Sequence, residues 1–192
     1  MSALLRNHGG SEIIIICIAH ADASKKTPRR LTPDGIKQTE QALRVASDTI
    51  SKLRAGEPLS SVRLVSSPAC RCLETILMAG EEFGKHFAHL DRCPPKMDRV
   101  EVREELYDHG YDLLNITQGQ TADLVVIALH GDLSKVSPLC DLALRTLDKD
   151  GFFDARPVIA IFRLQNGRLV PTVVEGFYQE WQNLVNADPS GG

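Results

Sequence analysis

Two histidines and one arginine occupy equivalent places along this chain. His20 follows the apolar run Ile13 to Ile18, His130 follows a second apolar run, and Arg71 comes shortly after a third strand-like segment. Phosphoryl transfer uses this set of side chains, because a neutral imidazole can attack phosphorus while cations hold the phosphoryl oxygens. The sequence therefore predicts a phosphate site built from His20, Arg71 and His130, although a lone histidine after a strand is more often structural.

The apolar runs before these residues predict buried strands. Ile13 to Ile18 and Leu124 to Leu129 are short and continuous, without the polar alternation of a half-exposed strand. Val62 to Val65 is predicted as a further strand. Because right-handed crossovers bring the carboxyl ends of parallel strands to one edge of a sheet, we expect the three site residues at that edge.

Helices are predicted after these strands. Thr32-Pro33 supplies a cap and a first-turn proline, and apolar residues then recur at helical spacing as far as Gly56. Ser67-Pro68 predicts the same start for a second helix, which puts Arg71 in its first turn. A third helix is predicted from Gly131.

The remaining segments are less regular. Arg99 to Arg103 predicts a weak strand, and Glu104 to Asn115 a loop that passes into a short helix. Val158 to Phe162 and Leu169 to Val174 predict a pair of strands joined by a hairpin turn at Gln165-Asn166-Gly167.

Length and composition favour one soluble domain. The chain has 192 residues, of which 43% are hydrophobic, and we expect a single domain over 1–187 with a disordered tail at 188–192. A secretory signal built on Arg6 and the isoleucines is the less favoured alternative, because Glu12 abuts a short apolar run. No segment approaches the ~20 apolar residues of a membrane span. We therefore expect a cytoplasmic protein that does not bind membranes.

The net charge of −3 argues against a general nucleic-acid binder, which would carry a basic surplus. The charge is uneven, however, since Lys25, Lys26, Arg29 and Arg30 follow closely after His20. A solvated loop explains most such runs, but the position of this one beside His20 favours a role in collecting anions.

The cysteines predict neither disulfides nor a metal site. Their number, five, is odd, and several lie in apolar segments, which favours reduced thiols. The spacing of His86, His89 and Cys93 fits no common zinc pattern. We expect no metal and no cofactor.

The order of the motifs resembles the histidine phosphatase, or phosphoglycerate mutase-like, superfamily. The motifs are a strand followed by x-His-x at His20, L-T-x-x-G-x-x-Q from Leu31 to Gln38, S-S-P-x-x-R-x-x-x-T from Ser66 to Thr75, and a strand followed by His130-Gly131. The compact length and the E-E-L-Y-D segment from Glu104 to Asp108 are most similar to the short bacterial phosphohistidine phosphatases. The resemblance implies an α/β fold, a three-layer αβα sandwich with a mostly parallel central sheet.

The resemblance also implies roles for the site residues. His20 would be the nucleophile that accepts the phosphoryl group, Arg71 a phosphate clamp, and His130 a second imidazole bonded to phosphoryl oxygens. Asp108 is our first choice for the proton donor and Glu105 the second. The substrate would be a phosphorylated small molecule or a phosphohistidine protein.

One departure from the family bears on activity. The family signature is Arg-His-Gly, and this chain has Ala19-His20-Ala21. Loss of one preorganised donor typically costs ~3–4 kcal/mol of transition-state stabilisation. A weakened phosphatase in which Lys25, Lys26 or Arg29 supplies the missing charge is one hypothesis. The alternative is a non-catalytic pseudophosphatase that binds a phosphorylated ligand or partner.

Overall fold

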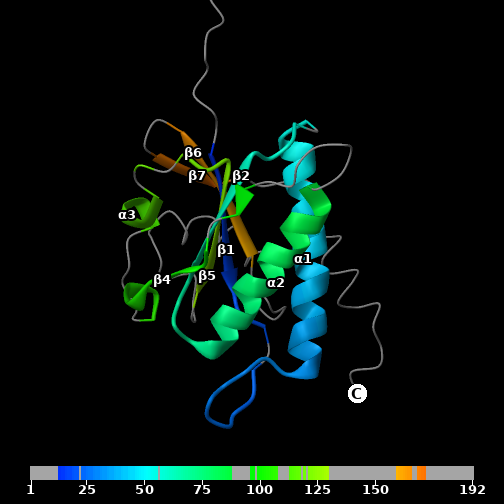
Figure 1. The fold of residues 1–192 in the computed structure, drawn as a ribbon, viewed down its shortest axis with the longest axis vertical. Helices are drawn as coiled ribbons and strands as arrows, with labels where there is room; N and C mark the ends of the chain where they lie inside the picture. Colours follow the sequence, from blue (N-terminus) through cyan, green and yellow to red (C-terminus); the bar gives the residue numbers. More distant parts are fainter. Residues whose placement is uncertain are drawn as a thin grey trace, which may run out of the picture.

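A computed structural model describes residues 13–21, 23–55, 57–87, 96–97, 99–107, 113–117, 119, 121–129, 159–165 and 168–171. Within these ranges the chain forms one sheet with helices on both faces, as the α/β prediction requires (Figure 1). The predicted helix after Gly131 and the predicted tail lie outside the described residues.

Among the described residues the sheet has seven strands, in the order β3-β2-β5-β1-β6-β7, and β4 also pairs with β2. The strands are β1 (Ile13–Ala19), β2 (Ser61–Ser66), β3 (Lys96–Met97), β4 (Glu101–Val102), β5 (Leu124–Leu129), β6 (Ile159–Gln165) and β7 (Arg168–Pro171). The pairings of β1 with β5 and of β2 with β3, β4 and β5 are parallel, whereas β6 runs antiparallel to β1 and β7. The prediction of a mostly parallel central sheet is confirmed.

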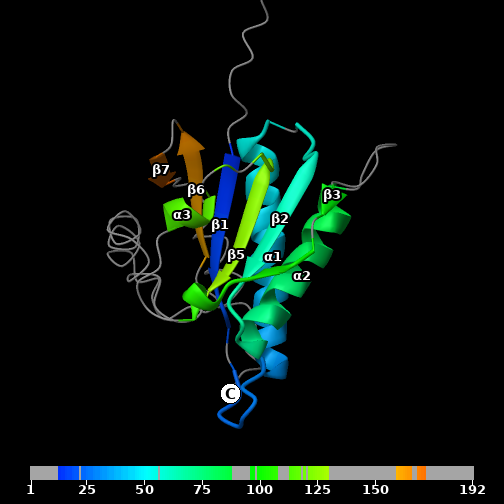
Figure 2. The same ribbon diagram turned by 60° about the vertical axis from the view of Figure 1, so that its left-hand side comes forward.

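The strand register brings three strand exits together. Ala19 at the end of β1 pairs with Leu129 at the end of β5, and Ser66 at the end of β2 pairs with Ala128. Because all three strands are parallel, the chain leaves each of them at the same edge of the sheet (Figure 2).

The continuous apolar run in β1 reflects cover on both faces. Ile14, Ile16 and Ile18 belong to a buried cluster with residues of the two long helices. Ile15 and Cys17 belong to a second cluster on the opposite face, as alternate residues of a strand must.

Two long helices, α1 (Pro33–Leu53) and α2 (Cys70–Phe87), lie side by side on one face of the sheet (Figure 1). A 3-10 helix, η1 (Glu104–Leu106), and a short helix, α3 (Leu113–Thr117), lie on the other. Within the described ranges, no helix is long and apolar enough to cross a membrane.

The two long helices differ at their starts. Thr32 caps α1 as predicted, because its Oγ1 accepts a bond of 3.0 Å from the Gly35 amide, and Pro33 is the first helical residue. The prediction that Pro68 opens α2 is wrong, since that helix begins at Cys70. The amide of Ser67 still donates to the carbonyl of Ala128 at 3.0 Å, which keeps the chain extended beyond β2.

The irregular segments follow the predicted order, with bounds that differ from the predicted ones. The weak strand predicted over 99–103 is reduced to β4, and the segment after it forms η1 and α3. The final strand pair is present as β6 and β7, in which Gln165 pairs with Arg168. The predicted turn at 166–167 lies outside the described residues.

Candidate functional site

His20 lies directly after the last residue of β1 and is half-buried. Its Nδ1 atom is 2.7 Å from the carbonyl oxygen of Ala21. A carbonyl can only accept a hydrogen bond, so Nδ1 carries the proton in this contact. The lone pair of the neutral ring is therefore on Nε2.

Arg71 faces that lone pair. It is the second residue of α2, is only 6% exposed, and donates from Nε to His20 Nε2 over 2.8 Å. Its backbone carbonyl accepts from Thr75 Oγ1 at 2.8 Å, which braces the first turn. The structure thus brings together two of the predicted site residues, His20 and Arg71.

The two contacts of His20 specify one protonation state. A proton on Nε2 would point at the N–H of Arg71, so this arrangement requires the neutral ring. An anion at this site would offer the arginine a better acceptor, because charge-assisted hydrogen bonds are the stronger ones. Such an anion would release the lone pair of Nε2 for attack.

The beginning of α2 adds a favourable field for an anion. The Oγ of Ser67 accepts weakly, at 3.4 Å, from the Ala69 amide. In Figures 1 and 2, α1 and α2 both begin at the edge of the sheet where β1 ends. The positive ends of two helix dipoles therefore point toward this edge.

Cys72 joins this helix start to the neighbouring strand. Its side chain is fully buried, and its Sγ donates to the carbonyl of Leu129 at 3.1 Å. Burial raises the pKa of the Cys72 thiol to about 12, against the opposing effects of Arg71 and a hydrogen bond with Ser67. The thiol is therefore a neutral structural donor, which fits the prediction of reduced cysteines.

The predicted cationic loop is exposed. Lys25, Lys26 and Arg29 lie on the segment 24–30, which is closed at its base by a β-bridge between Ala23 and Leu31. The amide of Ser24 also donates to the carbonyl of Arg30 at 2.8 Å. The loop projects beyond the sheet edge at which β1 ends (Figure 1). The role of Lys25, Lys26 and Arg29 in phosphate binding stays a prediction.

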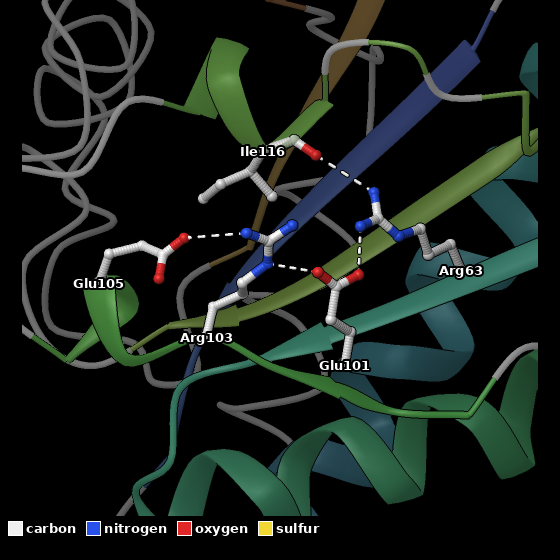
Figure 3. A network of polar contacts seen from close by, with 5 residues as sticks. All are labelled: Arg63, Glu101, Arg103, Glu105 and Ile116. Carbon is white, nitrogen blue, oxygen red and sulfur yellow. Dashed lines mark hydrogen bonds and ion pairs between the residues drawn. The ribbon is translucent and has the colours of Figure 1, made fainter.

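Glu105, the second choice for the proton donor, is the end of an ionic network on the α3 side of the sheet (Figure 3). Its Oε1 lies 3.3 Å from Nη1 of Arg103, and its side chain is half exposed. Arg103 also binds Glu101, which in turn binds Arg63, and Arg63 Nη1 donates to the carbonyl of Ile116 at 3.2 Å. Four segments, β2, β4, η1 and α3, are joined in this way.

The network favours the charged form of Glu101. Burial raises the pKa of Glu101, but hydrogen bonds and charges from Arg63 and Arg103 outweigh it, so that pKa lies below its ordinary value. Our sequence reasoning missed these contacts. The sequence does carry a signal for these ion pairs, because charges of opposite sign alternate at Glu101, Arg103 and Glu105. Alternate residues of an extended segment lie on the same side of it and can contact one another.

Two further predicted residues, His130 and Asp108, lie outside the described residues. Their roles as second imidazole and first-choice proton donor stay predictions. The part of the chain that the structure describes contains no group of three or more His, Cys, Asp or Glu side chains that could hold a metal ion.

The alanines on either side of His20 are packed. Ala19 is 8% exposed and belongs to the same apolar cluster as Cys17, and Ala21 is fully buried. Both neighbours of His20 in the chain therefore carry buried methyl groups.

Comparison with solved structures shows the fold. The chain is similar to a candidate phosphohistidine phosphatase, SixA, from Agrobacterium tumefaciens, with 18% identity and a TM-score of 0.54 over 78% of this chain and 90% of that one. It is also similar to a candidate phosphohistidine phosphatase SixA from Nakamurella multipartitia, with 21% identity and a TM-score of 0.51 over 85% and 95%. No family model and no curated protein matches the sequence.

Proposed function

We propose that this chain is a phosphatase that hydrolyses a phosphohistidine or a small phosphoester through a phosphohistidine intermediate on His20. The contact between His20 Nε2 and Arg71 Nε carries the proposal. It places the guanidinium directly beside the ring lone pair, while the carbonyl of Ala21 fixes the tautomer from the other side. Attack on phosphorus requires a lone pair together with a cation at that point.

The first step is phosphoryl transfer. Oxygens of the bound phosphoryl group accept the hydrogen bond from the Arg71 N–H in place of His20 Nε2. The freed Nε2 then attacks phosphorus. The Nε2–P bond forms as the bond from phosphorus to the leaving group breaks, and an acidic side chain gives the leaving group its proton. Asp108 is our choice for this acid, because Glu105 is paired with Arg103.

The second step is hydrolysis. Water attacks the phosphohistidine, the Nε2–P bond breaks, and the same acidic side chain, now a base, takes a proton from water. The hydrogen bond from Nδ1 to Ala21 holds the imidazole in place through both steps. Inorganic phosphate then leaves Arg71.

The shared fold and the cysteines support the choice of substrate and location. The shared fold is that of the two SixA structures, whose names indicate phosphohistidine as a substrate to test. The thiols of Cys70 and Cys72, which form no disulfide, support a reducing, cytoplasmic location. We propose a phosphorylated small molecule or a phosphohistidine protein as the partner, and no nucleic acid.

The test is a search for the intermediate. The protein is mixed with a 32P-labelled phosphohistidine peptide or acetyl phosphate and quenched in alkali, and the label should be acid-labile and map to His20. His20→Ala should remove it, whereas Arg44→Ala, at an exposed position of α1, should not. Label on another residue, or turnover by His20→Ala, would overturn the proposal.

A second candidate function is phosphate recognition without catalysis. The buried methyl groups of Ala19 and Ala21 favour it, because they occupy the places of a clamp and a flexible turn in the resembled family. A protein of this kind would bind inorganic phosphate in a way that depends on Arg71 and would form no labelled His20. The labelling experiment separates the two functions.

A further inference from the structure

The loop between β1 and α1 is tied to α2 at both of its ends. At its first end His20 accepts a hydrogen bond from Arg71, and at its last end Leu31 donates to Glu74. Arg71 and Glu74 are three residues apart in one helix and therefore lie on neighbouring parts of its surface. One helical turn thus holds both ends of the segment that contains the exposed cations.

Glu74 makes two contacts with this segment. Its Oε2 accepts from the Leu31 amide at 2.8 Å, and its Oε1 lies 3.4 Å from Arg30 Nη1. The side chain of Arg30 is 68% exposed, so the ion pair is weak. Leu31 is only 7% exposed, which makes the backbone contact the stronger anchor.

The hydrogen bond from the Leu31 amide to Glu74 fixes the position of the loop 24–30. Leu31 forms the bridge with Ala23 that closes the loop, and Lys25, Lys26 and Arg29 extend from the exposed part beyond it. A carboxylate that pointed into the anion site would repel an anionic ligand. The two carboxylate oxygens of Glu74 instead contact Leu31 and Arg30, so that Glu74 anchors the end of the loop to α2.

We propose that Glu74 is a positioning residue of the phosphate site. It holds the cationic loop 24–30 at the edge where His20 and Arg71 meet, and so it sets how efficiently an anionic substrate is captured. This inference rests on the proposed phosphatase function. It predicts an effect on KM and on phosphate affinity, with little effect on kcat, because the loop cations attract the substrate and His20 and Arg71 act on phosphorus.

Three variants separate the two contacts of Glu74. Glu74→Ala removes both and should raise KM about threefold to tenfold with kcat within about twofold, as expected for lost electrostatic capture. Glu74→Gln keeps an oxygen for the Leu31 amide and should stay close to wild type. Arg30→Ala removes the ion pair and one loop charge, and should change KM less than Glu74→Ala does. Glu81→Ala, at an exposed position of the same helix, is the matched control.

A second readout does not need activity. Hydrogen exchange of the Leu31 amide should be faster in Glu74→Ala than in wild type, with Glu74→Gln in between, and thermal unfolding should show that all variants are folded. Binding of inorganic phosphate should weaken in Glu74→Ala by the same factor as KM rises.

The outcomes distinguish this inference from the proposed function. If Glu74→Ala shows faster Leu31 exchange and weaker phosphate binding, but the wild-type protein has no turnover, the positioning role of Glu74 is supported and the phosphatase function is overturned. Unchanged Leu31 exchange, unchanged phosphate affinity, or a loss of kcat at constant KM in Glu74→Ala would overturn the positioning role, whether or not the protein is a phosphatase.

Discussion

The Nε atom of Arg71 lies 2.8 Å from the Nε2 atom of His20, across 51 positions of sequence. The pair joins the exit of β1 to the first turn of α2, and the carbonyl of Ala21 holds the other ring nitrogen at 2.7 Å. These two contacts leave Nε2 as the ring nitrogen without a proton, which can act as a base or nucleophile.

Replacement of Arg71 should abolish most activity. Arg71→Ala should lower kcat/KM about a thousandfold, because one preorganised donor typically contributes 10²–10³. Arg71→Lys should recover only part of this, since lysine keeps the charge but has no planar set of N–H donors. Steady-state kinetics on a phosphohistidine peptide measure the effect, with Arg44→Ala as the control. Equal activity of wild type and Arg71→Ala would contradict the role of the guanidinium.

The double variant Ala19→Arg, Ala21→Gly should raise phosphatase activity, and Ala19→Arg alone should raise it less. The arginine restores a charge-assisted clamp and the glycine restores backbone freedom beside phosphate. The gain should reach on the order of a thousandfold with full repair, or about tenfold where loop cations already fill the gap. Because both alanines are buried, we expect the double variant to be less stable by about 1–3 kcal/mol.

The measurements for that variant are kcat/KM and the midpoint of urea unfolding. His20→Ala in the repaired background should be inactive. A repaired protein that folds and binds phosphate but gains no activity would favour the non-catalytic binding function.

Cys72 should resist alkylation in the folded protein. Its pKa of about 12, raised from 9.0 by burial, keeps the thiol protonated well above neutral pH, and the thiolate is the reactive form. Iodoacetamide labelling at pH 8, read by mass spectrometry, should modify the partly exposed Cys70 and leave Cys72 intact until urea is added. Labelling of Cys72 in native protein at the rate of Cys70 would contradict its burial.

Glu101→Gln should destabilise the protein in a pH-dependent way. The pKa of Glu101 lies below its ordinary value of 4.5 in the folded state, so its charge stabilises the fold at neutral pH. That contribution is lost as the pH falls from 4.5 through the lower, folded-state pKa. At pH 7 the variant should lose about 1–3 kcal/mol, because Arg63 then lacks its charged acceptor.

Urea unfolding of wild type and Glu101→Gln at pH 7, 5 and 3 tests this expectation, and the difference between the two should shrink at pH 3. A constant difference over this range would show that the charge of Glu101 is not responsible. Glu81→Gln, which alters an exposed pair with Lys85, should change stability little at any pH.

The main strands and both long helices could be predicted because their signals are local. A continuous apolar run such as Ile13 to Ile18 requires cover on two faces, and Thr32-Pro33 specifies a helix start through its own side chain and ring. The start of α2 could not be read in the same way. Ser67 is still paired with Ala128 of another strand, and that contact delays the helix past Pro68.

The sequence by itself determined which side chains were available for chemistry, namely an imidazole after β1 and a guanidinium in the first turn of α2. It also placed cations after His20, since their order along the chain is local information. Only the tertiary structure decided that Arg71 donates to His20 Nε2, that Glu74 binds Leu31, and that Glu105 is paired within the network of Arg103 and Glu101. Contacts of this kind depend on strand register and helix placement, which arise from packing between segments far apart in the sequence, so no local pattern encodes them.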